Sequence, residues 1–340
     1  MNVLINQSYA PQRVTGQQRY AREIADRLAS TSSFDGLRPE GLWASSTLWV
    51  WAWVQCVLPL LARGTTVLSL TSRAPFWRRR HVLVVHDLFV LTNPRWFSRR
   101  YVWTHAPLLR AQIRSAAAVV AVSGPTADAL RPLRHDTVEV APNAPSEVFR
   151  DRPDLPDDHA LRRLGVQAGS YFLAVGSRDP RKNLARLARA YGLLDEEERR
   201  RSPLVVVGAA ASIYRSEELV WPEGTIDAGY VTDDDLRQLY RHSRAVVLVS
   251  LAEGFGLPLV EAAAAGARSL LVSDLPIFHW ICAGAARYVD PLSSDDIAAG
   301  LRLEVAKPHE EEVNLERFDW DASAAVVREV CGRVHRAGRA

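Results

Sequence analysis

Apolar residues in this chain come in short continuous runs, separated by turn-forming residues and by helical patterns. Such runs are typical of strands in a parallel sheet whose two faces are both covered by helices. In the first half of the chain they predict strands at residues 3–5, 65–70, 81–86, 118–123 and 137–141. In the second half they predict strands at residues 171–176, 204–208, 225–229, 245–250 and 269–272.

Helical patterns lie between these strands, at residues 19–28, 103–115, 183–194, 233–242 and 258–265. Strands that alternate with helices predict a doubly wound α/β fold, and 340 residues exceed what one hydrophobic core usually supports. We therefore predict two Rossmann-like domains, residues 1–150 and 151–317, with parallel sheets that face a cleft. The Asp- and Pro-rich stretch 151–158 is the predicted linker.

Composition narrows the class of protein without naming its chemistry. Hydrophobic residues make up 48% and charged residues 24%, which is ordinary for a globular protein, and the net charge of +3 does not by itself indicate a nucleic-acid partner. The three cysteines are far apart and form no CxxC pair. This spacing favours a reducing compartment such as the cytoplasm over a disulfide framework or a structural zinc site.

Two segments bear on membranes. The N-terminal apolar run, residues 1–5, is too short for a signal peptide. Residues 42–62 carry no charge over 21 residues, a length that could span a bilayer, but they contain Ser, Thr, Gln and Pro, and their Trp residues are not confined to the ends. A helix packed on a sheet is therefore the favoured interpretation, and a membrane span the less favoured one.

The most informative string is Glu253-Gly-Phe-Gly-Leu-Pro-Leu-Val-Glu261. It predicts a strand, a glycine turn and a helix with Pro258 at its first position. Gly254 and Gly256 let backbone N–H groups approach an anion closely, and the helix N-terminus favours negative charge. An anion with hydroxyl-rich groups on both sides would satisfy both glutamates, and a nucleotide sugar is such a ligand.

This string resembles the E-x7-E signature of retaining glycosyltransferases with the GT-B fold, in particular the large family 4. A second string, Gly176-Ser-Arg-Asp-Pro-Arg-Lys-Asn183, resembles the family's G-x-x-x-P-R-K-N segment. Two cations at a helix N-terminus are unfavourable unless an anion is bound, so Arg181 and Lys182 suit a diphosphate. Many members carry a further Arg where this chain has Ser177.

Other positions match the same family, which covers most of the chain. Gly229-Tyr-Val231 is similar to the turn that borders the nucleobase, and Gly208 ends a strand as the family's glycine does, although Ala209 stands where Lys is frequent. Thr15-Gly16 resembles a glycine turn near the donor phosphate. His86 follows a strand where the family places a His beside the donor sugar. Residues 318–340 look like the family's C-terminal helix, which crosses back to the first domain.

The resemblance implies transfer of a sugar from a nucleoside diphosphate with retention at the anomeric carbon and without a metal. It implies catalytic or charge-stabilising roles for Glu253, His86, Arg181 and Lys182. It implies donor-binding roles for a second group of residues, which are Gly16, Gly208, Val231, Gly254, Phe255, Gly256, Leu257 and Glu261. The motifs resemble bacterial polysaccharide mannosyl- and rhamnosyltransferases, so GDP-mannose is the first expectation for the donor and a glycan or lipid-linked molecule for the acceptor.

Other functions stay open at this point. No G-x-G-x-x-G follows any predicted strand, which disfavours a nicotinamide oxidoreductase. An epimerase or phosphorylase on the same two-domain scaffold is the nearest enzyme alternative. A non-catalytic protein that binds nucleotide sugars is a further alternative. The presence of all four charged motif residues argues against it, and these are Glu253, Glu261, Arg181 and Lys182.

Basic and aromatic residues alternate between Phe76 and Trp103. This stretch holds six arginines and a single acid, Asp87, and the arginines are Arg78, Arg79, Arg80, Arg95, Arg99 and Arg100. Such a mixture suits peripheral attachment to an anionic membrane surface. It also suits contact with an anionic glycan, or a solvated face whose aromatic rings lie in the core.

Overall fold

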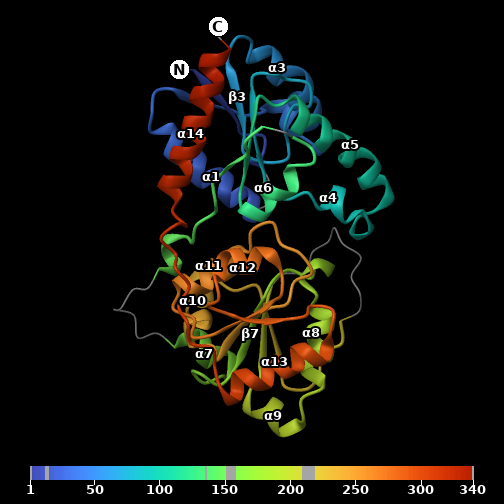
Figure 1. The fold of residues 1–340 in the computed structure, drawn as a ribbon, viewed down its shortest axis with the longest axis vertical. Helices are drawn as coiled ribbons and strands as arrows, with labels where there is room; N and C mark the ends of the chain where they lie inside the picture. Colours follow the sequence, from blue (N-terminus) through green and yellow to red (C-terminus); the bar gives the residue numbers. More distant parts are fainter. Residues whose placement is uncertain (1, 12–14, 135, 151–157, 209–218, 339–340) are drawn as a thin grey trace. The chain divides into compact units, whose positions relative to one another are not determined.

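The computed structural model describes residues 2–11, 15–134, 136–150, 158–208 and 219–338. The chain divides into two units, the first made of Met1–Asn143 and Phe318–Ala340, the second of Ala144–Arg317 (Figure 1). The second unit begins at Ala144 rather than at residue 151 because Phe149 is fully buried and packs edge-on against Tyr240, with ring centroids 5.9 Å apart. Most of the predicted linker lies outside the described residues.

The first unit is a parallel sheet of six described strands in the order β2-β1-β3-β4-β5-β6. Its strands are β1 (Val3–Asn6), β2 (Phe34–Leu37), β3 (Thr66–Ser69), β4 (His81–Val85), β5 (Ala118–Ala121) and β6 (Glu139–Val140). Its helices are α1 (Gly16–Ala29), η1 (Gly41–Ala44), α2 (Thr47–Ala52), η2 (Trp53–Val57), α3 (Leu58–Leu61), α4 (Phe89–Thr92), η3 (Pro94–Trp96), α5 (Arg99–Ser115), α6 (Gly124–Leu130) and α14 (Trp320–Ala337). The last helix, α14, packs against α1, and the two lie side by side in Figure 1.

The uncharged segment 42–62 packs on this sheet, as the favoured interpretation predicted. Val50, Trp53, Val54 and Leu58 are buried in one cluster with Val67 of β3. The helical run is broken into α2, the π-helix η2 and α3, since Pro59 has no N–H to donate to the Gln55 carbonyl. The indole N–H of Trp77 donates to that carbonyl instead, at 3.1 Å. No helix among the described residues is long and apolar enough to cross a membrane.

The second unit is also a parallel sheet of six described strands, in the order β12-β11-β10-β7-β8-β9. Its strands are β7 (Phe172–Val175), β8 (Leu204–Val207), β9 (Thr225–Gly229), β10 (Ala245–Leu248), β11 (Leu270–Ser273) and β12 (Arg287–Val289). Its helices are η4 (Glu147–Phe149), α7 (His159–Leu164), η5 (Pro180–Lys182), α8 (Leu184–Gly192), α9 (Glu196–Arg201), α10 (Asp233–His242), α11 (Leu257–Ala264), α12 (Pro276–Cys282) and α13 (Ser294–Ala306).

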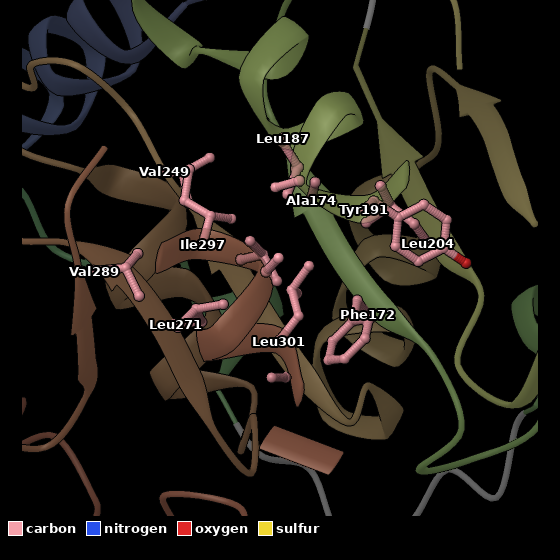
Figure 2. Close-up of a cluster of buried hydrophobic side chains, with 14 of the residues drawn as sticks. Phe172, Ala174, Leu187, Tyr191, Leu204, Val249, Leu271, Val289, Ile297 and Leu301 are labelled. Carbon is pink, nitrogen blue, oxygen red and sulfur yellow. The ribbon is translucent and has the colours of Figure 1, made fainter. Parts of the chain in front are cut away.

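One face of this second sheet carries the buried hydrophobic cluster shown in Figure 2. Phe172 and Leu204 from the strands meet Leu187 and Tyr191 of α8 and Leu301 of α13. These strands are apolar on both faces, which is what a parallel sheet covered by helices requires. The packing holds β7 and β10 as neighbours at the centre of the sheet, and their carboxyl ends position the candidate site.

Candidate functional site

The second sheet has the strand order of a dinucleotide-binding fold: β7 and β10 are parallel neighbours, and the order of successive strands reverses between them. In open α/β sheets, ligands bind outside the carboxyl ends of the strands at such a switch point. Two loops leave the sheet there. One follows β7 and ends in η5, and the other follows β10 and runs through Ser250 to Glu253. These loops carry the two motifs singled out in the sequence.

Lys182 and Glu253 form an ion pair across this switch point. The Lys182 ammonium lies 2.6 Å from Glu253 Oε1, and the two side chains are only 18% and 15% exposed. Ser250 donates its hydroxyl to the same oxygen at 2.8 Å. The stem of Lys182 passes over Gly176, where an added Cβ would lie 3.1 Å from the Lys182 Cγ. The structure thus brings together two of the four predicted catalytic residues.

Arg181 is held by a different carboxylate. Its Nε donates to Asp179 Oδ2 at 2.8 Å, and its backbone N–H donates to Asp179 Oδ1 at 2.9 Å. Asp179 is buried, so it needs a cationic partner. Asp179 and Glu253 balance the charges of Arg181 and Lys182 within the protein, so the two cations do not by themselves require a bound anion. The two cations lie in the 3-10 turn η5, which directly precedes α8, and so they are near a helix N-terminus as expected.

Asn183 fixes this loop, and sequence reasoning did not single it out. It adopts a left-handed conformation, with φ of 59°, at the junction of η5 and α8. Its side-chain amide donates to the carbonyls of Val249 and Pro291, at 2.9 and 2.7 Å. The first of these bonds ties the loop after β7 to the end of β10. Asparagine is among the few residues that adopt this conformation readily, which is the one signal the sequence offered.

Gly208 and Val231 lie at the ends of β8 and β9, on the same edge of the sheet. Gly208 has a φ of 155°, and its N–H donates to the Gly229 carbonyl at 2.8 Å. The loop after β9 turns at Gly229, and Val231 beyond it is buried while Tyr230 is exposed. Thr232 then caps α10 by accepting a hydrogen bond from the Asp235 N–H at 3.1 Å. Ala209 lies outside the described residues.

The glycine turn after Glu253 leads into α11 as predicted, one residue earlier than expected. Gly256 caps the helix with a φ of 92°, and α11 begins at Leu257. Gly254 precedes Phe255, whose ring packs edge-on against Trp280 at a centroid distance of 6.2 Å. Glu261 lies within α11 and is only 5% exposed. The roles of these residues in donor binding stay predictions.

His86 and Gly16 belong to the first unit. Burial lowers the pKa of His86 to about 4, against the opposing effect of a hydrogen bond with the Leu70 carbonyl, so the ring is neutral at pH 7. Its Nε2 lies 2.9 Å from that carbonyl and must carry the proton, which leaves Nδ1 as an acceptor. Gly16 begins α1, and a Cβ added there would meet no atom within 4 Å. Tyr20, one turn further along α1, packs edge-on against His86, with centroids 5.1 Å apart.

No group of three or more His, Cys, Asp or Glu residues in the described part of the chain is arranged to hold a metal ion. The polar groups at the switch point are instead two cation–carboxylate pairs, the serine hydroxyl and the backbone of two glycine turns. Such a set can bind a phosphate with its cations and N–H groups and sugar hydroxyls with its carboxylates.

Residues 165–317, which include this whole arrangement, match the family model of glycosyl transferases group 1. This region is a group 1 glycosyltransferase domain. The match spans the second unit from the end of α7 to its last residue. It covers the motifs at Gly176 and Glu253 that suggested the family.

Two mannosyltransferases of Escherichia coli are similar to about two thirds or more of this chain. The chain is 29% identical over 238 residues to the O-antigen chain mannosyltransferase B of Escherichia coli, covering 66% of this chain and 61% of that protein. It is 27% identical over 269 residues to the serotype-specific mannosyltransferase WbdA of Escherichia coli, covering 71% of this chain and 32% of that protein. The chain thus spans less than two thirds of the length of either relative.

Solved structures establish the fold of both units together. Sucrose-phosphate synthase from Thermosynechococcus elongatus superposes with a TM-score of 0.74 at 16% identity, over 99% of this chain and 100% of that one. Alr3699/HepE of Anabaena, solved with UDP and glucose, superposes with a TM-score of 0.70 at 17% identity, over 98% and 100%. The glycosyltransferase WaaG, which is involved in lipopolysaccharide biosynthesis, gives 0.67 at 16% identity, over 99% and 98%. The chain therefore has the GT-B fold that the sequence predicted.

Proposed function

We propose that this protein transfers a sugar from a nucleoside diphosphate to a glycan or lipid-linked acceptor, with retention of configuration and without a metal ion. One observation carries the proposal. The Lys182–Glu253 pair joins the two motif loops at the switch point of a group 1 glycosyltransferase domain. At that place a ligand meets a cation and a carboxylate that are already held in position.

The chemistry of the reaction gives each charge a role. As the bond to the sugar breaks, negative charge grows on the departing diphosphate, and preorganised cations and N–H groups stabilise it. Lys182, Arg181 and the backbone at Gly254 and Gly256 supply these groups. Glu253 accepts hydrogen bonds from hydroxyls of the donor sugar, and Glu261 from those of the ribose. His86, neutral at pH 7, offers Nδ1 to the sugar.

GDP-mannose is the donor we propose first. Of the relatives reported above, one is named an O-antigen chain mannosyltransferase and the other a serotype-specific mannosyltransferase, which supports mannose and a bacterial polysaccharide product. The nucleobase is expected beside the turn Gly229–Val231, where Val231 is buried and Tyr230 is exposed. Their side chains carry no charge that would select one base over another.

We further propose that the first unit attaches to the surface of an anionic membrane. Of the large apolar side chains that the described residues expose, nine fall between Leu42 and Trp103, among them Leu48, Leu60, Leu61, Trp77 and Trp103. The helices that carry them are connected, because Trp51 of α2 packs on His105 of α5 and His105 stacks on Tyr101. Arg79, Arg95, Arg99 and Arg100 are exposed in the same stretch. Apolar and basic side chains together suit an anionic lipid surface.

The structure corrects the role of one arginine in this segment. The guanidinium of Arg78 donates hydrogen bonds to the carbonyls of Pro59, Ala62 and Thr65, and so it closes the end of α3. It is part of the fold and not a free surface charge. Liposome co-sedimentation should therefore compare the wild type with an Arg79/Arg99/Arg100→Ser variant. We expect salt-sensitive binding of the wild type to anionic vesicles, and equal recovery in the supernatant with neutral and anionic vesicles would remove the membrane from the account.

A thermal-shift screen of GDP, UDP, ADP, TDP and their sugar conjugates tests the proposed activity. A ligand that binds the folded state raises the melting temperature in proportion to the logarithm of its concentration over its Kd. We expect GDP and GDP-mannose to give the largest shifts, and the addition of EDTA to leave them unchanged. Glu261→Ala should weaken binding by about 1.5–3 kcal/mol through loss of hydrogen bonds to a charged group. A protein that none of these ligands stabilises would not be a nucleotide-sugar transferase.

A further inference from the structure

We propose that Ser250 is a positioning residue that holds Glu253 ready for the donor sugar when Lys182 turns to the diphosphate. The inference deepens the proposed function and rests on it, because it takes Glu253 as the group that meets the donor. Ser250 itself is only 1% exposed and is hydrogen-bonded to Glu253, so it acts through Glu253 and not by touching the substrate.

A short chain of hydrogen bonds leads from the sheet to Glu253. Ser273, the last residue of β11, is fully buried and donates its hydroxyl to the carbonyl of Ser250 at 2.7 Å. Ser250 follows β10 and donates its own hydroxyl to Glu253 Oε1 at 2.8 Å. Each step joins a buried side chain to a fixed backbone or carboxylate group. The orientation of Glu253 is therefore set by β10 and β11, which are neighbouring strands of the second sheet.

Both donors to Glu253 meet the same oxygen. The Lys182 ammonium and the Ser250 hydroxyl approach Oε1, and among the described residues Oε2 accepts no hydrogen bond. A glutamate side chain with free rotation loses entropy when it is ordered by a ligand, and two fixed donors remove that cost in advance. Oε2 is then left as the acceptor that faces the ligand.

The two donors differ in what they do once a diphosphate arrives. Lys182 is a cation, and the diphosphate competes with Glu253 for it. The Ser250 hydroxyl is neutral and buried, so the diphosphate does not draw it away. Ser250 is thus the donor that keeps Glu253 in place in the donor complex. This predicts that removal of the Ser250 hydroxyl affects the sugar part of the donor and spares the diphosphate part.

The first experiment is a double-mutant cycle on the ligand-free protein, read by thermal or denaturant unfolding. Ser250→Ala and Glu253→Ala should be non-additive, because the two residues share one hydrogen bond. Ser243→Ala is the matched control, since Ser243 is equally buried and donates its hydroxyl to the Tyr240 carbonyl at 2.9 Å. Ser243→Ala should be additive with Glu253→Ala. Additivity in both cycles would overturn the proposal, whatever the ligand proves to be.

The second experiment compares GDP with GDP-mannose, and UDP with UDP-glucose, by calorimetry. Ser250→Ala should lower affinity for the sugar conjugate about tenfold, as expected for a hydrogen bond to a charged group, and leave affinity for the free diphosphate within about twofold. Ser250→Thr, which keeps the hydroxyl, should bind the sugar conjugate with an affinity close to that of the wild type. An equal loss for both ligands would give Ser250 a purely structural role and overturn the proposal. If the wild type binds none of the four, the proposed donor fails, and the ligand-free cycle still decides the Ser250–Glu253 contact.

Discussion

A Cβ added to Gly208 would lie 1.9 Å from the carbonyl oxygen of Gly176. The loop after β7 and the end of β8 are therefore so close that only a glycine fits. The N–H of Gly176 in turn donates to the Val207 carbonyl at 2.9 Å, so the two strand ends are joined at the point where the Gly176–Asn183 motif begins.

Gly208→Ala should therefore destabilise the second unit by about 2–4 kcal/mol, because strain at a φ of 155° adds to overpacking against backbone. Gly229→Ala is the matched control. Gly229 also has a positive φ, of 61°, but an added Cβ meets no atom within 4 Å. Denaturant unfolding should show a clearly smaller loss of unfolding free energy for Gly229→Ala. Equal losses would mean that the close contact with Gly176 does not contribute to the destabilisation.

Replacing Arg181 by alanine should reduce the stability of the protein more than replacing Lys182 by alanine. Arg181→Ala leaves the buried Asp179 without its guanidinium, and we expect a loss of about 2 kcal/mol. Lys182→Ala leaves Glu253 with the Ser250 hydroxyl and more contact with solvent, so its cost should be smaller while turnover falls strongly. Melting temperatures measured beside turnover decide this, and a larger stability loss for Lys182→Ala would contradict the assignment of partners.

Gly16→Ala tests whether a ligand approaches the start of α1. No protein atom lies within 4 Å of the added Cβ, and alanine is a better helix former than glycine. Stability should therefore stay the same or rise slightly, while the KM for the donor rises if the donor phosphate needs the space beside the backbone. Unchanged kinetics in a stable variant would remove Gly16 from the site.

Acid should destabilise the first unit through His81. Burial lowers the pKa of His81 from its usual value of 6.5 to about 3, and neither ring nitrogen has a hydrogen-bond partner among the described residues. As the pH falls, His81 takes up a proton in the unfolded chain at a higher pH than in the folded protein. The stability that the neutral ring contributes is therefore complete above pH 6.5. It falls as the pH drops from 6.5 towards 3, with about 1.4 kcal/mol lost at pH 5.5.

His81→Phe should remove that part of the acid sensitivity. We expect the difference in unfolding free energy between pH 7.5 and pH 5.5 to shrink in the variant by roughly the same amount. His242→Gln provides a control at a histidine that is less deeply buried, where the loss should be smaller. An unchanged difference in His81→Phe would show that this histidine does not set the pH dependence.

The apolar runs predicted most of both sheets because a strand buried on two faces leaves an unambiguous pattern. They did not predict β2, whose sequence Phe34-Asp-Gly-Leu37 has two exposed residues at an edge of the sheet. They also missed β12, whose residues Arg287 and Tyr288 are partly exposed. Edge strands bury less surface, and so their sequences are less constrained.

The motifs located the candidate site, but not how its charges are balanced. That Arg181 pairs with Asp179 and Lys182 with Glu253 depends on the turn that Asn183 makes and on the neighbouring places of β7 and β10 in the sheet. Neither the turn nor the strand order can be inferred from the spacing of residues along the sequence. Ser250 was likewise visible only as the end of an apolar run, because its hydrogen bond to Glu253 requires the loop geometry.

The anomeric configuration of the first product tests the central claim most directly. With GDP-mannose, whose sugar is α-linked, proton NMR recorded during turnover with an acceptor or during slow transfer to water should show an α-linked product or α-mannose before it equilibrates. This is the result that retention at the Lys182–Glu253 site predicts. A β-anomer as the first product would contradict the retaining mechanism and the roles assigned to both residues.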